Sequence, residues 1–191
     1  MLHETLTGDG RAVRLRLAVE GDAAELIQAV DAVAREGAYF LRSRFEVDVE
    51  KERAFIASAR DRGDLMLVAE IEERIVGWVT LFRGRAEFMQ HVGELGMGVI
   101  RGYRGLGIGA VLMEQTLHWA SGQGFEKVNL GVRASNQRAR ALYRKFGFVE
   151  EGYKVQQIKD LEGRYDDDIE MAYFVAASPS SSRVAGKRQG A

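Results

Sequence analysis

The sequence predicts a single domain of the α/β (α+β) class, in which helices flank a mixed β-sheet. The chain has 191 residues, which is the usual size of one compact domain. Segments with strand-like alternation of apolar residues and segments with helical spacing follow one another along the chain. No repeat or low-complexity linker interrupts residues 13–175. We therefore expect one folded unit over residues 13–175, a flexible N-terminus over 1–12, and a disordered tail over the small and polar residues 176–191.

The first part of this unit is predicted to form one strand and two helices. Apolar residues alternate with arginine over residues 13–17, which is typical of a half-buried strand. Residues 20–22, Glu-Gly-Asp, offer an N-cap for a helix that carries apolar residues from 23 to 30. A second helix is predicted over residues 48–62, with Gly63 as its stop.

The middle of the chain is predicted to form an antiparallel hairpin, a third strand and a helix. Residues 65–71 and 75–82 are apolar and flank a short polar turn, as in a hairpin. A further strand is predicted over residues 92–100. It leads into the glycine-rich residues 101–109, which open onto a helical pattern over residues 110–123.

The last part is predicted to add three strands and one helix. Residues 128–132 alternate as in a strand, and Asn136 then begins a helix with apolar residues at helical spacing. Gly147 stands where a glycine commonly ends a helix. Two more strands, predicted around residues 148–155 and 168–174, complete the mixed sheet.

The charge balance argues against two classes of partner. Lysine and arginine number 27, aspartate and glutamate number 28, and the formal net charge is −1. Proteins that bind nucleic acids or anionic membranes usually carry a basic excess, which this chain lacks. We expect neither a nucleic-acid partner nor a membrane partner, and any anion site has to be local.

The residue types also exclude several chemistries. The chain has no cysteine, so disulfides, zinc–thiolate clusters and a cysteine nucleophile are ruled out. Its three histidines, His3, His91 and His118, are too scattered to suggest a metal site. The first residues lack the pattern of a signal peptide, and no apolar run is long enough to span a bilayer. We expect a cytoplasmic protein without a metal.

The glycine-rich loop is the strongest indication of a ligand. Gly105, Gly107 and Gly109 let backbone amides approach a ligand closely, and the predicted helix turns its unpaired N–H groups toward the same place. Arg101 and Arg104 add two cations beside the loop. A strand, a glycine loop and a helix in this order favour a pyrophosphate.

Several interpretations of this loop stay open. Glycine could simply permit tight packing between strand and helix. A Walker loop is disfavoured because no Lys-Ser or Lys-Thr follows the glycines. Gly105, Gly107 and Ala110 satisfy the fingerprint of an NADP-dependent Rossmann oxidoreductase, but the next strand runs into Arg133 rather than an acidic residue. Coenzyme A is the third nucleotide candidate, since its pyrophosphate needs backbone donors and its pantetheine arm needs an exposed strand edge.

Two motifs carry a resemblance to a known family. The run Arg-Gly-Tyr-Arg-Gly-Leu-Gly-Ile-Gly at residues 101–109 contains the loop pattern Gln/Arg-x-x-Gly-x-Gly/Ala, with its cation at Arg101 or Arg104. A second pattern, Asn-x-x-Ala-x-x-x-Tyr-x-x-x-Gly-Phe, begins at Asn136 and ends at Phe148. Together they strongly resemble the acetyl-CoA-binding core of the GNAT N-acetyltransferase superfamily. The chain's ending is similar to the branch that acetylates amino acids, protein N-termini or polyamines.

The resemblance implies a mostly antiparallel central sheet and acetyl-CoA as cosubstrate. It assigns the pantetheine and the thioester carbonyl to backbone groups of the strand at residues 97–99, and the pyrophosphate to the loop that follows. The implied coenzyme-binding residues are Met97, Gly98, Val99, Arg101, Arg104, Gly105, Leu106, Gly107, Ile108, Gly109, Asn136 and Tyr143. Asn136 also suits a simple helix cap, and Gly96 and Gly98 also suit a β-bulge without a ligand.

The resemblance also implies two catalytic roles. Tyr143 looks like the family's general acid, which protonates the leaving thiolate, although a tyrosine on an apolar helix face is also an ordinary core residue. An alkylammonium acceptor must lose a proton before it attacks. Glu94, on the strand that enters the site, is the leading candidate for this base, directly or through a water, and His91 is the second. Both could equally be solvent-facing residues.

The acceptor side is less well defined by the sequence. Tyr39, Phe40 and Arg42, from the loop between the first two helices, are expected to bind the acceptor together with Glu94. Phe45 of the same loop, and Tyr153 and Tyr165 near the end of the chain, are expected to complete the pocket. The acceptor is a small-molecule amine or a peptide N-terminus, and a homodimer is compatible with the family. A second class of function is a catalytically silent CoA-binding sensor or interaction module.

Overall fold

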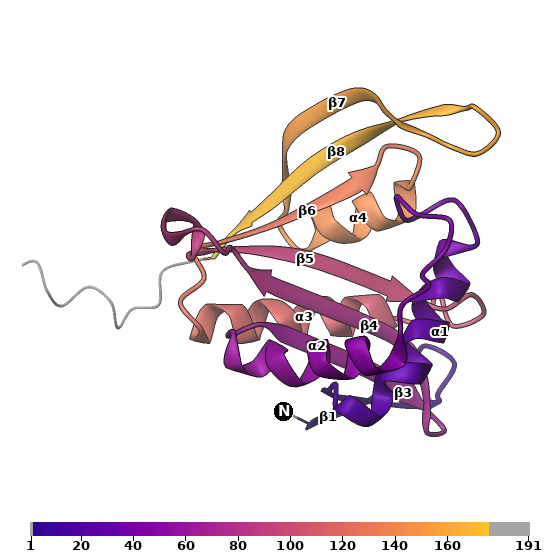
Figure 1. Ribbon diagram of the computed structural model, residues 1–191, viewed down its shortest axis with the longest axis vertical. Helices are drawn as coiled ribbons and strands as arrows, with labels where there is room; N and C mark the ends of the chain where they lie inside the picture. Colours follow the sequence, from indigo (N-terminus) through magenta and orange to yellow (C-terminus); the bar gives the residue numbers. More distant parts are fainter. Residues whose placement is uncertain (1, 176–191) are drawn as a thin grey trace, which may run out of the picture.

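A computed structural model describes residues 2–175 as four helices and one eight-stranded sheet with the strand order β1-β2-β3-β4-β5-β6-β8-β7 (Figure 1). The strands are β1 (Leu2–Leu6), β2 (Ala12–Leu17), β3 (Leu65–Ile71), β4 (Arg74–Arg83), β5 (Val92–Val99), β6 (Lys127–Arg133), β7 (Val149–Lys159) and β8 (Tyr165–Phe174). The helices are α1 (Ala23–Ala34), α2 (Val49–Asp61), α3 (Ile108–Gly122) and α4 (Gln137–Lys145), with short 3-10 turns at Glu20–Asp22 and Glu87–Met89. The predicted class, a mixed and mostly antiparallel sheet flanked by helices, is confirmed.

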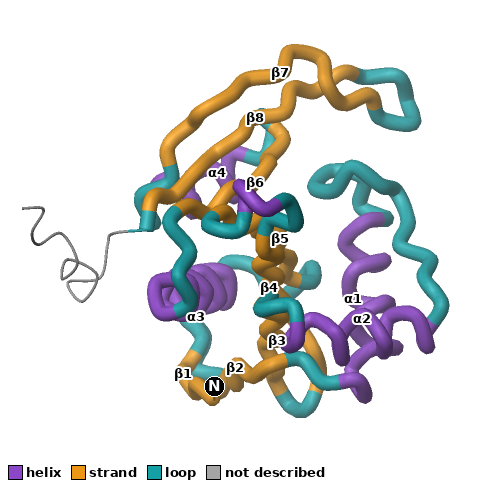
Figure 2. Tube along the Cα trace, turned by 60° about the vertical axis from the view of Figure 1, so that its left-hand side comes forward, coloured by secondary structure: helices purple, strands orange, loops and turns teal. Residues whose placement is uncertain are grey.

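The helices cover both faces of the sheet. Figure 2 shows the central strands edge-on, with α3 and α4 on one side and α1 and α2 on the other. Each side has its own core. Leu65 and Leu67 of β3 point into the α3 side, whereas Met66 and Val68 point into the α1–α2 side. Strand β3 is therefore buried along its whole length, which explains its continuous apolar sequence.

Local sequence signals place the ends of the helices. Asp48 caps α2, because its Oδ1 accepts hydrogen bonds from the amides of Glu50 and Lys51 at 3.1 Å. Gly63 follows this helix with a φ of +69°, a conformation that glycine adopts without steric cost. The predicted hairpin is also present, since β3 and β4 pair antiparallel.

The prediction of a flexible N-terminus over residues 1–12 is wrong for the described residues. Leu2–Leu6 form strand β1, which pairs antiparallel with β2. The turn that follows reaches the glycine loop, because the amide of Gly8 donates to the carbonyl of Leu106 at 3.0 Å. Backbone pairing rather than an apolar pattern orders this segment, so its polar sequence gave no sign of it. The predicted tail, residues 176–191, lies outside the described residues.

The sheet opens at its only parallel pair among the described strands. Strands β5 and β6 pair in parallel register only from Val92 opposite Lys127 to Glu94 opposite Asn129, and the two strands separate beyond that point (Figure 1). A Rossmann fold would need several adjacent parallel strands. The alternative of an NADP-dependent oxidoreductase is therefore not supported.

The C-terminal strands are longer than predicted and form a curved hairpin. Strands β7 and β8 extend beyond the rest of the sheet, and their tip faces the segment between α1 and α2 (Figure 2).

Within residues 2–175, no helix is long and apolar enough to cross a membrane. Over the same residues, no group of three or more histidine, aspartate or glutamate side chains is placed to hold a metal ion.

Candidate active site

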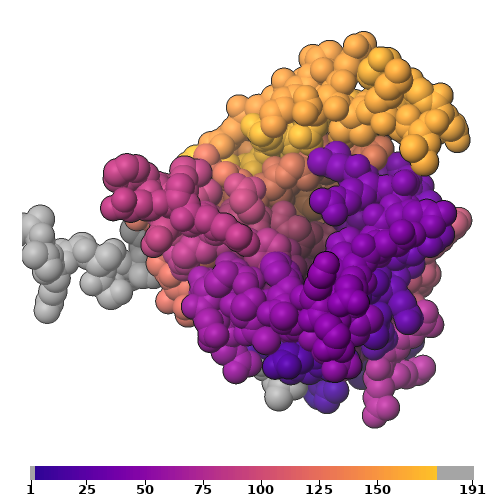
Figure 3. Space-filling model, viewed as in Figure 1, coloured from indigo at the N-terminus to yellow at the C-terminus, as the bar shows by residue number. Residues whose placement is uncertain are grey.

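A cavity of about 770 Å³ lies where β5 and β6 separate. On the surface, the molecule is hollowed between the α1–α2 segment and the β7–β8 hairpin (Figure 3). Of the predicted site residues, the cavity brings together Tyr39, Phe40, Met97, Gly98, Val99, Arg104, Gly105, Gly107, Ile108, Gly109, Asn136 and Tyr143. Four others, Arg42, Glu94, Arg101 and Leu106, do not line it.

One edge of β5 faces the cavity. The opposite edge pairs with β4 in continuous register from Gly93 to Val99, so the β-bulge considered for Gly96 and Gly98 is absent. Glycine at 98 has a packing cause instead, since a Cβ there would lie 2.4 Å from the ring of Trp78. Beyond Glu94 the free edge has no strand partner in the described sheet. Its backbone donors and acceptors are available to an extended ligand.

The glycine loop ends as the N-terminus of α3. Gly105 and Gly107 have φ values of +87° and +90°, a left-handed conformation that other residues rarely adopt. No side chain caps α3, and the first amides of a helix have no partner within it. Free amides at this point and the positive end of the helix dipole would favour an anion at the cavity wall.

Arg104 lies in the cavity but is committed to other groups. Its guanidinium donates to both carboxylate oxygens of Glu36 at 2.7 and 2.6 Å and to the carbonyl of Val99 at 2.8 Å. It also stacks over the ring of Tyr39, 4.5 Å from the centroid. The hydrogen-bonded Glu36 raises the pKa of Arg104 above its ordinary value. Arg104 thus ties the end of α1 to the loop, and its role toward a phosphate stays a prediction.

Arg138 is the cation that sequence reasoning missed. It stands on the first turn of α4, it lines the cavity, and one of its guanidinium nitrogens lies 3.1 Å from where a Cβ on Gly105 would be. Within the described part of the chain it makes no salt bridge or hydrogen bond. Arg101 is exposed and outside the cavity. The only available signal for Arg138 was its place two residues after Asn136.

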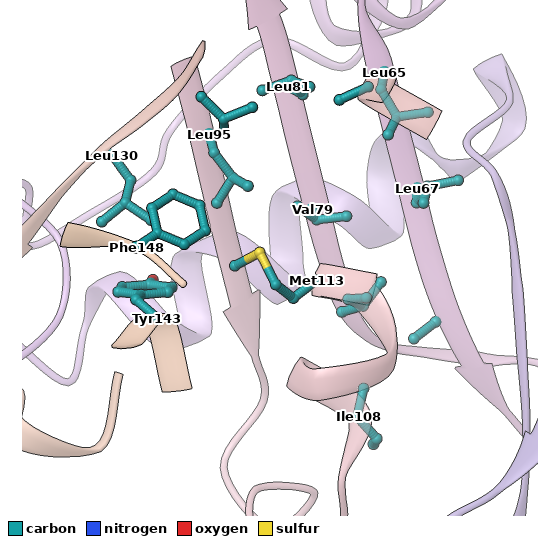
Figure 4. Packing of buried hydrophobic residues seen from close by; sticks show 14 of the residues in the cluster. Leu65, Leu67, Val79, Leu81, Leu95, Ile108, Met113, Leu130, Tyr143 and Phe148 are labelled. Atoms are coloured by element: carbon teal, nitrogen blue, oxygen red, sulfur yellow. The ribbon is translucent and has the colours of Figure 1, made fainter. Parts of the chain in front are cut away.

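Asn136 and Tyr143 bring α4 into the site. Asn136 caps this helix, since its Oδ1 accepts from the amide of Ala139 at 3.2 Å, and it also lines the cavity. Tyr143 is only 7% exposed and packs against Phe148, with ring centroids 5.8 Å apart (Figure 4). Burial raises the pKa of Tyr143 to about 12. The phenol therefore keeps its proton at neutral pH.

The two predicted bases lie outside the cavity. Glu94 is exposed on β5, and its Oε1 accepts a hydrogen bond from the side-chain amide of Asn129 at 3.1 Å. Its neighbours Leu95 and Gly96 do line the cavity. His91 is exposed just before β5 begins, at the end of the strand away from the glycine loop.

The predicted acceptor residues are split between wall and surface. Tyr39 and Phe40 form part of the cavity wall. The carbonyl of Phe40 accepts a hydrogen bond of 2.5 Å from Arg133 of β6, which links the α1–α2 segment to the open side of the sheet. Arg42 is exposed and does not reach the cavity. Tyr153 is exposed on the β7–β8 hairpin, where its hydroxyl donates to Asp167 at 2.7 Å.

Comparison with known proteins decides the family. The model of the Acetyltransferase (GNAT) family matches residues 23–148. The chain belongs to the GNAT family. Over 109 residues this GNAT chain is 30% identical to the "Probable N-acetyltransferase san" of Drosophila melanogaster, and the alignment covers 56% of the chain and 59% of that relative.

Two further comparisons name more specific proteins. The GNAT chain is 29% identical over 135 residues to an N-alpha-acetyltransferase of Sulfolobus acidocaldarius, covering 64% of the chain and 74% of the relative. A solved structure, the ribosomal-protein-alanine N-acetyltransferase of Brucella melitensis, superposes with a TM-score of 0.77 at 27% identity, covering 84% of this chain and 98% of that one.

Proposed function

We propose that this GNAT protein transfers the acetyl group of acetyl-CoA to a primary amine by direct attack in a ternary complex. One observation carries the proposal: a single cavity contains an unpaired strand edge, an uncapped helix N-terminus behind left-handed glycines, and a buried tyrosine. These three features match the pantetheine, the pyrophosphate and the leaving thiolate of acetyl-CoA. The membership in the GNAT family supports the same chemistry.

The residues present fit the cosubstrate. The free edge of β5 from Leu95 to Val99 offers backbone groups to the pantetheine amides. The amides at the start of α3 offer donors to the pyrophosphate, and Arg138 adds a positive charge beside Gly105. Asn136 contributes its side-chain amide at the same wall.

Tyr143 and Glu94 are assigned the two proton transfers. As the amine attacks the thioester carbon, the carbon–sulfur bond breaks and the phenol of Tyr143 protonates the departing sulfur. Glu94 accepts the proton of the acceptor nitrogen through a water, because its carboxylate lies outside the cavity wall. The coenzyme's thiol and an amide are then the products.

The acceptor is the α-amino group of a peptide or a small-molecule amine. Two similar proteins are named for N-alpha and ribosomal-protein-alanine acetylation, which favours the peptide. The acceptor is proposed to enter through the hollow between the α1–α2 segment and the β7–β8 hairpin (Figure 3). Tyr39 and Phe40 form its wall on the side of α1.

Release of free thiol from acetyl-CoA tests the proposal. Purified protein is incubated with acetyl-CoA and a panel of amino acids, diamines and peptides with free N-termini, and thiol is measured with a chromogenic reagent. We expect amine-dependent thiol release, with the acetylated amine confirmed by mass spectrometry. A protein that binds CoA but releases no thiol with any amine would be the silent CoA-binding module instead.

A further inference from the structure

Gly131 occupies a sensitive position on the open side of the site. It stands on β6 just past the last residue that pairs with β5, and it lines the cavity opposite the free edge of β5. Successive residues of a strand point to opposite faces, so position 131 faces the same side of the sheet as Arg133, which reaches Phe40 of the α1–α2 segment. That side is the open hollow where the acceptor is proposed to enter.

A carboxylate from the next strand takes the place of the missing side chain. A Cβ on Gly131 would lie 3.4 Å from Oδ1 and 3.9 Å from Oδ2 of Asp168. Asp168 belongs to β8, directly opposite Arg133 of β6. Asp168 does not itself line the cavity, but its carboxylate lies beside Gly131, which does.

This carboxylate has no partner among the described residues, unlike its neighbours. Asp166 accepts hydrogen bonds from the hydroxyl and amide of Ser135, and Asp167 from Tyr153 and the amide of Gln156. Asp168 is half-buried yet accepts no hydrogen bond and forms no ion pair.

The cations around Asp168 are engaged elsewhere. Arg133, which faces it from β6, donates to the carbonyl of Phe40. Lys154, which faces it from β7, forms its ion pair with Glu170, and its positive charge also acts on Asp168 without a hydrogen bond between them. Glu170, the next carboxylate on the same face of β8, is thereby neutralised. A half-buried carboxylate without a partner costs free energy that a cationic ligand can recover.

We propose that Asp168 binds the positively charged nitrogen of the acceptor at the mouth of the cavity. The inference rests on the proposed function and narrows it to acceptors that carry an alkylammonium group. The acceptor nitrogen is positively charged when it arrives as an ammonium group. It is positively charged again just after it has bonded to the acetyl carbon, before it loses its second proton. A fixed carboxylate stabilises both states and aims the nitrogen at the strand edge where the thioester is proposed to lie.

Binding to the CoA-loaded protein tests this role without any acetyl transfer. The probes are alanyl-alanine amide and butylamine, each compared with a neutral analogue, propionyl-alanine amide and 1-butanol. Calorimetry on wild type, Asp168→Asn and the control Glu126→Gln, an exposed carboxylate just before β6, gives the dissociation constants. We expect Asp168→Asn to weaken at least one charged probe by about 10- to 100-fold, and to leave the neutral analogues and the affinity for CoA unchanged. Glu126→Gln should behave as wild type.

The outcomes separate this inference from the proposed function. If wild type binds neither charged probe better than its neutral analogue, or if Asp168→Asn binds them as wild type does, the role of Asp168 is refuted even when thiol release from acetyl-CoA proceeds normally. If binding depends on Asp168 but no amine is acetylated, the ammonium site stands and the proposed activity fails. Unchanged CoA affinity in Asp168→Asn shows in either case that the variant is folded.

Discussion

The two walls of the cavity are built by different means. The proposed coenzyme wall is mostly backbone: the free edge of β5, the left-handed glycines and the first amides of α3. The proposed acceptor wall uses side chains from segments far apart in the chain, with Tyr39 and Phe40 on one side and, by the inference above, Asp168 beside Gly131 on the other. Backbone groups can bind a ligand that is the same in every reaction, such as the coenzyme, with few side chains. Side chains can be substituted without changing the backbone, so a wall made of them can be adapted to a different acceptor. Substitutions in the two walls should therefore affect different substrates.

Gly107→Val is expected to have the largest effect. A valine at a φ of +90° is strained, and its side chain would occupy the space where a phosphate approaches the loop. We expect CoA to raise the melting temperature of wild type and to leave that of Gly107→Val unchanged. Gly124→Val is the matched control, since Gly124 has a φ of +75° and open surroundings at the other end of α3. Equal stabilisation of both variants by CoA would refute the phosphate site.

Tyr143→Phe is expected to have the second-largest effect. It keeps the ring against Phe148 and removes only the hydroxyl, so the fold and the affinity for CoA should persist. Loss of a positioned acid should lower kcat by at least about tenfold. Tyr173→Phe, in the same aromatic stack, removes a hydroxyl without this role and should keep the wild-type rate.

The pH profile sharpens this test. Burial raises the pKa of Tyr143 to about 12. The phenol therefore stays protonated through the neutral range and loses its proton only as the pH rises through that value. No decline of kcat due to Tyr143 should occur on the alkaline side below it. A decline near the ordinary tyrosine pKa of about 10, present in wild type and absent in Tyr143→Phe, would contradict the assigned burial.

Arg138→Ala should have a moderate effect confined to the coenzyme. Loss of a charged hydrogen bond is expected to weaken CoA binding by about tenfold, and the loss should shrink as salt is added. Because Arg138 lies beside Gly105, CoA and dephospho-CoA should be affected equally, which places the cation at the pyrophosphate. Arg101→Ala, outside the cavity, should bind CoA as wild type does.

The coenzyme wall was largely predictable from the sequence, and the acceptor wall was not. Gly107, Asn136 and Tyr143 lie in two continuous motifs whose local patterns indicate loop, cap and buried helix face. Asp168 and Arg104 depend on tertiary geometry: the first on the register between β6 and β8, the second on where Glu36 falls after folding. Strand β1 could not be predicted either, because it is ordered by backbone pairing with β2, which also depends on the tertiary structure.

The smallest effect is expected for Glu36→Gln. The ion pair of Glu36 with Arg104 is about one-fifth exposed on each side and holds the end of α1 to the glycine loop. We expect a loss of about 1–3 kcal/mol in the free energy of unfolding and a change in CoA affinity of only a few fold. Glu46→Gln, which affects a much more exposed pair with Arg44, should cost less. Chemical denaturation of the two variants gives their free energies of unfolding. Equal values would contradict the conclusion that the ion pair of Glu36 stabilises the fold.

The separation of the two walls can be measured directly in one set of steady-state kinetics. Arg138→Ala, Asp168→Asn and the double variant are assayed with both substrates varied, using the best amine found in the thiol-release panel. We predict that Arg138→Ala raises only the KM for acetyl-CoA, that Asp168→Asn raises only the KM for the amine, and that the double variant shows the product of the two effects. A variant of one wall that raises both KM values to the same extent would contradict the division of the cavity into a coenzyme wall and an acceptor wall.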